Sequence, residues 1–394
     1  MRPSRTEGVR RRPSPAAVNA VIAIQAFRPH VGGAELQLER LVPHLAGRGV
    51  RSEIVTRAVS GCPRRERIAG AVVHRTPVAG ESPLASVVYV GVALGRLLRD
   101  RSRIDLVHAH GALSPATIAL GARLAGLPSV VTVLGTGQHG DLARLVRKPL
   151  GRARARMLFR TAWFVALSDD AREELVGHGV PAERIRVIPN GVDIADHRPA
   201  SADERTPLRD ELGLPAGGFL GTFVGRLHPV KDVDTLLAAT ARVPELSLVV
   251  VGDGPDRGRL EMEAARLDVS DRVIFQGQSR RVPDLLRASD VFLLSSHGEG
   301  MSNALLEAMA SGLPCLASRT VGGARELLAN GRGLLVADGD VAAWADAIRS
   351  VRDSPELASA LGQAAAGHIA GSLSLESTAD RLARAYAEIA GVTA

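Results

Sequence analysis

The chain has 394 residues, of which 45% are hydrophobic, 23% charged and 3% aromatic, and its formal net charge is +7. This length is too great for one ordinary hydrophobic core and predicts two domains, while the composition argues against disorder for most of the chain. Scarce aromatic residues argue against a stacking platform for nucleic acid, and two cysteines, Cys62 and Cys315, indicate neither a disulfide framework nor a metal site. We therefore expect a protein of the reducing cytoplasm without a nucleic-acid partner.

The N-terminus superficially resembles a secretion signal. Three consecutive arginines, 10–12, precede an apolar stretch, but Asn19 and Gln25 interrupt that stretch and no small-residue cleavage site follows. We expect residues 1–17 to form a disordered basic arm that leads into the first strand. Elsewhere no apolar stretch is long enough for a membrane-spanning helix.

From residue 18 onward, short apolar runs alternate with longer stretches of helical periodicity. This alternation is typical of a parallel sheet with helices on both faces. In the first half, we predict strands at 18–26, 52–56, 72–74, 104–108, 130–134, 163–166 and 185–188, and helices that include 34–47, 84–99 and 168–177.

A polar, proline-containing stretch, 196–215, breaks the pattern and is the expected domain boundary and hinge. A second series follows, with strands at 219–224, 246–251, 273–275, 291–294, 314–317 and 334–336 and closing helices at 341–352, 355–371 and 375–390. We therefore predict an α/β protein with two doubly wound, Rossmann-like domains, 18–195 and 196–372, followed by a C-terminal helical segment, 373–394.

Two segments of the first half lead out of strands toward a ligand. Gly32 and Gly33 open the first helix, where paired glycines leave room for an approaching phosphate or sugar, although a tight turn alone would use them equally well. His110 follows a strand at the carboxyl edge of the sheet, where open parallel sheets bind ligands. It is a candidate for positioning an acceptor or stabilising developing charge; a structural histidine is the alternative.

The segment from Gly135 to Gly140 has the Gly-x-Gly-x-x-Gly spacing of dinucleotide-binding loops and follows a strand. That fingerprint requires an acidic residue about twenty positions later for the ribose hydroxyls. No aspartate or glutamate occurs between Asp141 and Asp169. We therefore predict that this segment is not a nicotinamide site.

Residues 142–160 contain six arginines and one lysine, interleaved with leucine, valine, methionine and phenylalanine. Such a segment suits peripheral binding to an anionic membrane, which would place the protein at the inner face of the membrane. A solvated helix face is the other interpretation, and both remain open.

In the second half, the strand 219–224 ends in Gly225-Arg226-Leu227, and Lys231 follows five positions after Arg226. Both cations follow the carboxyl end of a strand. The guanidinium fork and the compact ammonium suit a diphosphate, whose oxygens need neutralising when it departs. Two solvated loop cations are the alternative.

Residues 297–319 are the most informative stretch. A loop with Glu299 follows a buried strand, and a helix begins near Ser302, so that unpaired backbone N–H groups and a partial positive charge form an anion site. Gly298 and Gly300 would let backbone amides approach a ligand closely.

Glu307 lies on this helix among Leu305, Leu306 and Met309, which make the helix apolar nearly all round. We therefore predict that Glu307 is well buried and needs polar partners, for which sugar hydroxyls are suitable. Exposed positions for both acids are the alternative. Together with Arg226 and Lys231, the stretch predicts a nucleotide-sugar site.

Six segments occur in a characteristic order between about residues 18 and 340: Gly32-Gly33-Ala34-Glu35, His108-Ala-His110-Gly111, Pro189-Asn190-Gly191-Val192-Asp193, Gly225-Arg226-Leu227 with Lys231, Val251-Gly252-Asp253-Gly254-Pro255, and Glu299 with Glu307. In these segments the chain resembles the retaining GT-B glycosyltransferases of family 4, and the last pair has that family's E-x7-E spacing. One pair of acids is weak evidence, but the ordered set is highly specific.

The resemblance implies a donor bound mainly by the C-terminal domain. Glu307 would hold the ribose, Glu299 would lie near the transferred sugar, and Arg226 and Lys231 would hold the diphosphate. The other donor contacts that it implies are Gly33, Gly225, Gln278 and the amides of Gly300, Met301, Ser302 and Asn303.

His110 corresponds to the family's active-site histidine near the reacting centre. The family usually needs no protein-bound metal, and its last helix commonly packs back onto the first domain. Two positions depart from the family pattern. Asp232 stands where glycine is most frequent, which would either weaken the phosphate loop or cap the next helix, and Leu134 stands where a histidine often precedes glycine.

The family implies retention of the anomeric configuration. A carboxylate nucleophile would predict a covalent intermediate, but no first-domain acid is well placed for that role. We therefore favour front-face transfer from a nucleotide-diphosphate sugar, expected to be a UDP-sugar, to a glycan, lipid-linked or small-molecule acceptor, with the departing diphosphate taking the acceptor proton. The alternatives are a nucleotide-sugar epimerase of the same fold and a binding module with an inert cleft.

Overall fold

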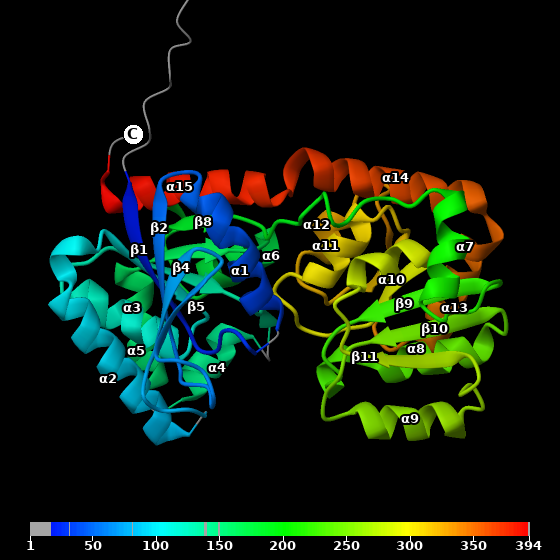
Figure 1. Ribbon diagram of the computed structural model, residues 1–394, viewed down its shortest axis with the longest axis horizontal. Coiled ribbons are helices and arrows are strands. Elements are labelled where there is room, and N and C mark those ends of the chain that lie inside the picture. The colour runs from blue at the N-terminus through cyan, green and yellow to red at the C-terminus, as the bar shows by residue number, and fades with distance from the viewer. Residues whose placement is uncertain (1–16, 31, 81, 138–139, 149, 393–394) are drawn as a thin grey trace, which may run out of the picture.

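The computed structural model describes residues 17–30, 32–80, 82–137, 140–148 and 150–392, so the predicted basic arm lies almost entirely outside the described residues. Its strands form two separate sheets that lie side by side (Figure 1). The first sheet has the order β3-β4-β2-β1-β5-β6-β7-β8, and the second has the order β11-β10-β9-β12-β13-β14. This arrangement confirms the predicted GT-B fold of two Rossmann-like halves.

The strands of the first sheet are β1 (Val18–Ile24), β2 (Val50–Thr56), β3 (Arg65–Ile68), β4 (Ala71–Arg75), β5 (Leu106–His110), β6 (Ser129–Val133), β7 (Trp163–Ala166) and β8 (Ile185–Val187). Those of the second sheet are β9 (Phe219–Val224), β10 (Leu246–Val251), β11 (Val273–Gly277), β12 (Val291–Leu294), β13 (Cys315–Ser318) and β14 (Leu334–Val336). Every predicted strand agrees with an observed one to within two residues at each end.

The helices beside the first sheet are α1 (Gly33–Ala46), α2 (Pro83–Arg99), α3 (Ser114–Leu124), α4 (Asp141–Arg147), α5 (Gly151–Thr161) and α6 (Asp169–Gly177), with 3-10 turns η1 (Arg101–Arg103) and η3 (Ala182–Arg184). The remaining elements are α7 (Ala202–Glu211), η4 (Pro229–Lys231), α8 (Val233–Arg242), α9 (Arg257–Arg266), α10 (Val282–Ala288), α11 (Asn303–Ala310), α12 (Ala324–Leu327), α13 (Val341–Asp353), α14 (Pro355–Ser372) and α15 (Leu375–Ala390).

Each face of the first sheet is covered by helices because alternate residues of a buried strand point to opposite sides. On β1, Ile22 and Ile24 pack with Leu38 of α1. Val21 and Ala23 pack on the other face with α2. The same alternation on β2 places Ile54 on the α1 face and Val55 on the α2 face.

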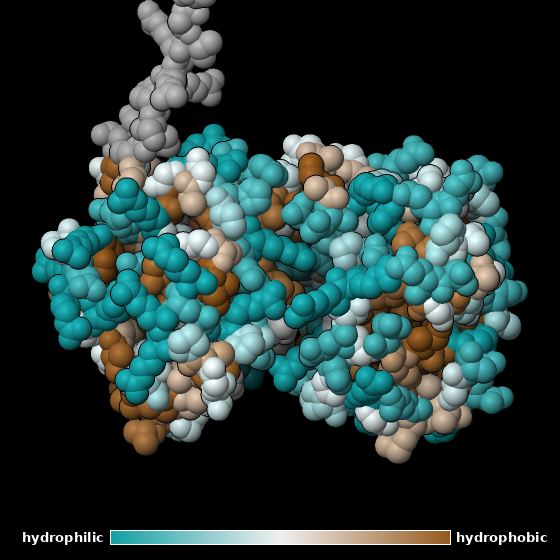
Figure 2. All heavy atoms as spheres, in the orientation of Figure 1, coloured by the Kyte–Doolittle hydropathy of each residue, from teal (hydrophilic) through white to brown (hydrophobic). Residues whose placement is uncertain are grey.

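The C-terminal helices connect the two halves. In Figure 1, α14 runs along the second half and α15 continues over the first. α15 packs against α1, β1 and β5. Gly191, in the segment Pro189-Asn190-Gly191-Val192-Asp193, lies against this crossing, because a Cβ there would come within 2.6 Å of the carbonyl oxygen of Ser374. Figure 2 shows a waist between the two lobes, with a notch on the side away from α14 and α15.

Two elements were not predicted. β3 is a short antiparallel edge strand with the sequence Arg-Glu-Arg-Ile, whose polar pattern gave no strand signal. The stretch 196–215, predicted as the domain boundary and hinge, contains α7, a helix that was not predicted. The helix is polar along its length but is anchored by Arg209, which is buried and donates to Oδ2 of Asp290 at 2.7 Å. Tertiary burial of an arginine therefore stabilises a helix that apolar periodicity could not reveal.

Candidate active site

The two predicted diphosphate cations follow β9 but have different surroundings. Gly225 and Arg226 begin the loop that leads to η4, and Arg226 is exposed, without a side-chain partner among the described residues. The Lys231 side chain is only 17% exposed, and its Nζ donates to Oε1 of Glu299 at 2.6 Å. The structure therefore brings Lys231 and Glu299 into direct contact and leaves Arg226 facing outward.

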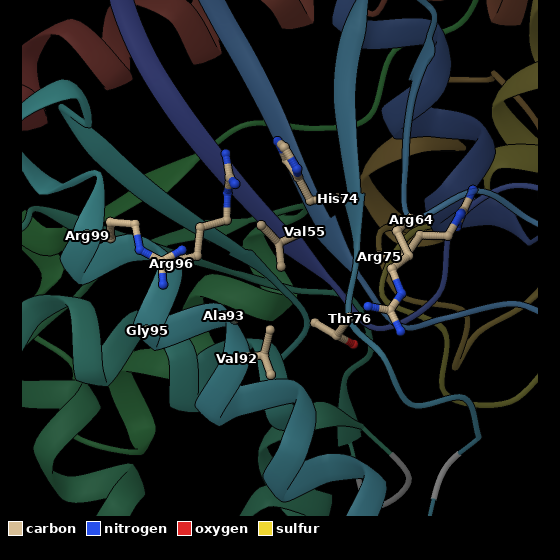
Figure 3. A pocket seen from close by; sticks show the side chains of 10 residues that line it. All are labelled: Val55, Arg64, His74, Arg75, Thr76, Val92, Ala93, Gly95, Arg96 and Arg99. Carbon is tan, nitrogen blue, oxygen red and sulfur yellow. The ribbon is translucent and has the colours of Figure 1, made fainter.

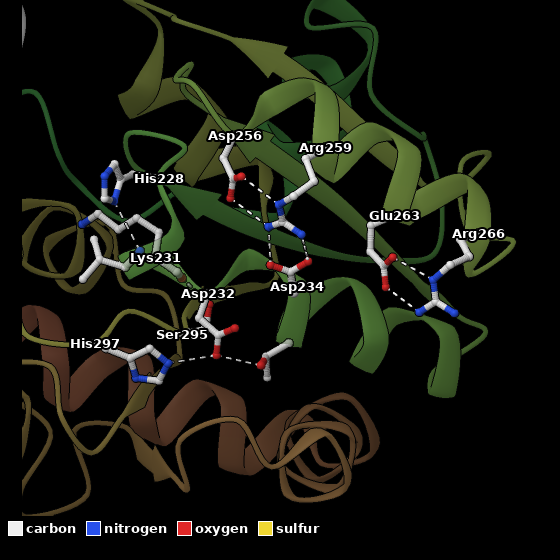
Figure 4. Close-up of polar contacts among 12 residues, drawn as sticks. His228, Lys231, Asp232, Asp234, Asp256, Arg259, Glu263, Arg266, Ser295 and His297 are labelled. Carbon is white, nitrogen blue, oxygen red and sulfur yellow. Dashed lines mark hydrogen bonds and ion pairs between the residues drawn. The ribbon is translucent and has the colours of Figure 1, made fainter.

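Asp232 has φ +46°, in the left-handed region that glycine favours. Aspartate is one of the residues that tolerate this region, which explains how it replaces the family's glycine. Its carboxylate accepts a hydrogen bond from Thr235 Oγ1 at 2.7 Å and lies 3.1 Å from Nε2 of His297 (Figure 4). Asp232 occupies the N-cap position of α8, but among the described residues its side chain accepts from the Thr235 hydroxyl and from no backbone N–H of the first turn, so side-chain capping is not observed.

The loop between β12 and α11 lies against the first half of the chain. Thr136 Oγ1 donates to the carbonyl oxygen of Glu299 at 3.0 Å. A Cβ on Gly300 would come within 2.4 Å of the carbonyl oxygen of Leu134. Glycine at position 300 is thus required by the approach of another backbone, whereas the sequence had suggested approach of a ligand. This contact holds Glu299 at the junction of the two halves.

The start of α11 is bridged to the first half by a side chain. Met301 and Ser302 are buried immediately before the helix. The Asn303 side chain then donates from Nδ2 to the carbonyl oxygen of Gly33 at 2.8 Å and accepts at Oδ1 from Nδ2 of Asn190 at 2.8 Å. Gly33, predicted to approach the donor from the first domain, therefore lies directly beside the helix terminus that carries the other predicted donor contacts.

Glu307 is largely buried, with 13% of its side chain exposed, and its partners come from elsewhere in the chain. Nη1 of Arg40, on α1, donates to its Oε1 at 2.6 Å, and Nε2 of the buried His197 lies 3.7 Å away. Burial lowers the pKa of His197. Neither Arg40 nor His197 was predicted as a site residue, and nothing in the sequence distinguishes Arg40 from the chain's other helical arginines.

His110 ends β5 and lies in a network that includes the C-terminal helix. Its ring centroid is 4.6 Å from that of the buried His108. Nδ1 of His108 lies 2.5 Å from the hydroxyl of Tyr386 in α15, and Nε2 lies 2.6 Å from Thr132 Oγ1. Burial lowers the pKa of His110 to about 4 and that of His108 well below its ordinary value. Both imidazoles are therefore neutral near pH 7. Neither Tyr386 nor His108 was predicted as a site residue.

Two predicted site residues stand apart from these contacts. Gln278 follows β11 and is exposed, and no contact with another predicted site residue is found for it within the described ranges. The same holds for Arg226. The contacts observed instead join Gly33 to Asn303 and Lys231 to Glu299.

The described residues of the Gly135–Gly140 segment lie at the junction of the two halves, where Thr136 donates to Glu299, and residues 138 and 139 lie outside the described ones. Asp141 opens α4, and its Oδ2 accepts from the backbone N–H groups of Leu134 at 2.9 Å and Ala112 at 3.4 Å. Burial raises its pKa. This carboxylate thus fastens two loops of the first half to each other.

The arginine-rich segment 142–160 folds as α4 and α5. Its leucines at 142, 145 and 158 and its Phe159 are buried in the core with β6 and β7. The large apolar side chains that it still exposes are Leu150 and Met157. Most of the apolar pattern is therefore explained by core packing, while Arg152, Arg156 and Arg160 remain on the surface.

Neither a metal-binding cluster nor a membrane-spanning helix is found in the described parts of the chain. No group of three or more histidine, cysteine, aspartate or glutamate side chains there is arranged to hold a metal ion. None of the helices described here combines the length and the apolarity that crossing a bilayer requires.

Two family models match the chain, one over each half. The model described as "Glycosyltransferase Family 4" matches residues 31–196, and that described as "Glycosyl transferases group 1" matches residues 204–368. A D-inositol 3-phosphate glycosyltransferase of Mycobacterium avium (strain 104) is 31% identical over 95% of this chain and 93% of its own length. A putative glycosyltransferase, EpsF of Bacillus subtilis (strain 168), is 33% identical over 74% of this chain and 77% of its own.

Solved structures show the same architecture. Sucrose-phosphate synthase from Thermosynechococcus elongatus superposes with a TM-score of 0.81 and 23% identity, covering 95% of this chain and 100% of that one. HepE of Anabaena, solved in complex with UDP-glucose, gives a TM-score of 0.78 and 22% identity, covering 94% and 99%. At these identities the likeness concerns the fold.

Proposed function

We propose that this chain, which belongs to the family 4 glycosyltransferases, moves a sugar from a UDP-sugar to an acceptor held by its first domain, with retention of configuration. The observation that carries this proposal is the contact between Lys231 and Glu299 at the junction of the two halves. It places a cation suited to a departing diphosphate beside the acid expected near the transferred sugar. That HepE was solved with UDP-glucose supports the choice of donor.

We propose front-face transfer, in which the departing diphosphate takes the acceptor proton. Two features support this choice over a covalent intermediate. Glu299 is held by Lys231, which compensates its charge and orients it. Asp141, an acid at the first-half edge of the cleft, is fastened to two backbone N–H groups. The protein then acts mainly by positioning both substrates and stabilising the diphosphate, and we expect no protein-bound metal to take part.

The acceptor side rests on His110. As a neutral imidazole, it can donate or accept one hydrogen bond to an acceptor hydroxyl without adding charge. The activity for which the M. avium relative is named supports a phosphorylated polyol as one acceptor class to test, beside glycan and lipid-linked acceptors.

A panel of nucleotide sugars, scored by the rise in melting temperature, tests the donor, because a ligand that binds only the folded state stabilises it by mass action. Transfer to soluble and lipid-linked acceptors follows, with and without EDTA. A nucleotide-sugar epimerase would convert the donor with no acceptor present. A panel in which no nucleotide sugar raises the melting temperature would favour a binding module and contradict the proposal.

Arg40→Ala should tighten binding of UDP by about two- to fivefold. Arg40 pairs with Glu307 at 2.6 Å, so a ribose that uses Glu307 must compete with a half-buried ion pair of about 0.5–1 kcal/mol. Calorimetric titration with UDP measures the change. Arg48→Ala is the matched control, since Arg48 pairs with Asp380 of α15 instead. Weaker UDP binding in Arg40→Ala would show that Arg40 positions Glu307 rather than competing for it.

We also propose peripheral association with an anionic membrane through residues 142–160. Changing Arg152, Arg156 and Arg160 to glutamine should lower binding to vesicles of phosphatidylglycerol by about 10²-fold, because each surface cation contributes about 1 kcal/mol. Cosedimentation measures this. The matched control changes three exposed arginines of the second half, Arg242, Arg280 and Arg325, by the same charge. Equal losses of vesicle binding in both variants would show that binding depends on net charge and not on residues 142–160.

A further inference from the structure

Four neighbouring side chains at the carboxyl edge of β2 and β4 are buried and incompletely hydrogen-bonded. Thr56 and Arg75 are partners across the two strands, and Arg57 and Thr76 follow them. We call these four residues the β2–β4 corner. They are 0%, 6%, 5% and 2% exposed, respectively, and each has a buried polar atom without a partner: Thr56 Oγ1, Arg75 Nη1, Arg57 Nε and Thr76 Oγ1. Buried donors of this kind normally have partners, so the corner requires an explanation.

The charge of the corner is incompletely compensated. Arg57 donates to the carbonyl oxygen of Gly80 at 2.6 Å and to the hydroxyls of Ser86 at 2.9 Å and Ser114 at 3.4 Å. No carboxylate among the described residues pairs with it. Its guanidinium also lies 5.5 Å from the centre of the Tyr89 ring. A buried guanidinium that meets only neutral acceptors and an aromatic face is costly unless an anion completes its surroundings.

Arg75 has one acidic partner. Its Nη2 donates to Glu66 Oε1 at 2.5 Å and to the carbonyl oxygen of Arg28 at 2.6 Å, while its Nη1 has no acceptor. Over the described residues, the two guanidinium groups of the corner thus have one carboxylate partner, Glu66. The imbalance favours a ligand that brings negative charge and several acceptor oxygens.

The corner touches both first-half segments of the candidate active site. Arg57 reaches Ser114, the first residue of α3, four positions after His110. The other arginine of the corner reaches Arg28, in the loop that leads to Gly33. A group bound at the corner would therefore lie between the elements that carry His110 and Gly33, where an acceptor must approach the donor sugar.

A cavity of about 370 Å³ adjoins the corner and is lined by Arg75 and Thr76 together with Val55 and α2. Figure 3 shows side chains of α2, including Arg99, on one side of it and Arg64 and Arg75 on the other. Arg64 and Arg99 are exposed and have no acidic partner within the described ranges. The volume suits a small polyol phosphate or a lipid headgroup.

Two other basic residues beside this cavity, Arg96 and His74, share the carboxylate of Glu53. Glu53 Oε2 accepts from Arg96 Nη2 at 2.7 Å and lies 3.1 Å from His74 Nε2. Burial lowers the pKa of His74, so its ring adds little positive charge near pH 7. Of the arginines that line the cavity, Arg64 and Arg99 therefore lack an acidic partner among the described residues. Arg57 does not line the cavity, but it follows Thr56 at the same strand ends as Arg75 and Thr76, which do.

We propose that the β2–β4 corner and its cavity bind a phosphate group of the acceptor, and that Arg57 is the residue that selects anionic acceptors. This inference rests on the proposed function, since it assigns an acceptor class to the same transfer site. A phosphate supplies oxygens for the unpartnered donors of Arg57 and Thr76 and compensates the guanidinium charge. The phosphate can belong to a soluble polyol phosphate or to a phospholipid headgroup.

The first test is calorimetric titration with myo-inositol 1-phosphate in saturating UDP, so that diphosphate-binding groups are occupied. We expect binding to the native chain, a loss of at least about tenfold in Arg57→Gln because a charged hydrogen-bonding group is removed, and no change in Arg103→Gln, which alters an exposed arginine of η1. Unphosphorylated myo-inositol should bind far more weakly. Equal binding of the phosphate by the native chain and Arg57→Gln would overturn the proposal.

The melting temperature separates a loss of phosphate binding from a loss of folding. A retained UDP-induced rise in melting temperature shows that Arg57→Gln is folded with an intact donor site. If Arg57→Gln does not fold, Thr76→Val, which removes one unpartnered hydroxyl, should still lower phosphate binding severalfold. If UDP stabilises the native chain but neither myo-inositol 1-phosphate nor vesicles with phosphatidylinositol 4-phosphate bind, this inference fails and the proposed function stands. If UDP itself has no effect, the proposed function fails.

A vesicle-binding experiment distinguishes a soluble phosphate from a phospholipid headgroup. Vesicles with phosphatidylinositol 4-phosphate in phosphatidylcholine are compared with phosphatidylcholine alone by cosedimentation. Arg57-dependent vesicle binding identifies a lipid-borne phosphate, and Arg57-dependent binding of the soluble phosphate alone identifies a free one. Dependence on Arg57 in neither arm contradicts the inference.

Discussion

Lys231→Ala is expected to lower the rate of sugar transfer by about 10²–10³-fold, the loss typical of removing one preorganised group that stabilises developing negative charge. Lys231 is largely enclosed, so its ammonium acts where water screens little. Release of nucleoside diphosphate under saturating donor and acceptor measures the effect. Lys148→Ala is a matched control, because Lys148 and Lys231 are the chain's only lysines and Lys148 is exposed on the surface after α4.

A second comparison separates charge stabilisation from a secondary disturbance of Glu299. Lys231→Ala leaves the Glu299 carboxylate without its 2.6 Å partner, and an uncompensated acid would itself impair the site. The double variant Lys231→Ala/Glu299→Gln removes that charge as well. If the double variant regained near-native turnover, or if Lys231→Ala released nucleoside diphosphate at a near-native rate, the assignment of Lys231 to the diphosphate would be wrong. Arg226→Ala is also expected to lower turnover steeply.

Acidification should destabilise the folded chain through the buried histidines of β5. Burial lowers the pKa of His110 from its ordinary 6.5 to about 4, so the folded state resists protonation while the unfolded state takes up a proton below pH 6.5. The stabilisation is therefore complete above pH 6.5 and is lost as the pH falls toward 4. The loss for His110 alone is about 3 kcal/mol over this window, at about 1.4 kcal/mol per pH unit. The buried His108 adds to it in the same direction.

Urea unfolding at several pH values between 7.5 and 5 would measure this dependence. His110→Asn should flatten the slope of unfolding free energy against pH by up to one proton. His178→Asn, at an exposed position after α6, is the control and should change the slope little. A slope in His110→Asn equal to that of the native chain would show that His110 titrates alike in the folded and unfolded states.

Local sequence patterns predicted the strand, loop and helix of the expected donor site, because interactions between residues close in sequence determine these elements. The apolar run of β12, the serine cap of α11 and the glycine that ends it gave the strand, loop and helix that carry Glu299 and Glu307. The same reasoning missed α7, whose burial involves Arg209 and a partner on another segment. It also attributed the space at Gly300 to a ligand, because the backbone of Leu134 comes from a different half of the chain.

The sequence by itself determined the two-domain α/β plan, the family and the positions of the acids and cations expected to bind the donor. These depend on periodicity within a few residues and on the order of short motifs. Only the tertiary structure decided which side chains these residues contact. Arg40 meets Glu307 across 267 positions and Tyr386 meets His108 across 278, while Thr56, Arg57, Arg75 and Thr76 share one corner because β2 and β4 pair in register. Such contacts depend on how separate elements pack, and that packing depends on buried surfaces that no local pattern contains.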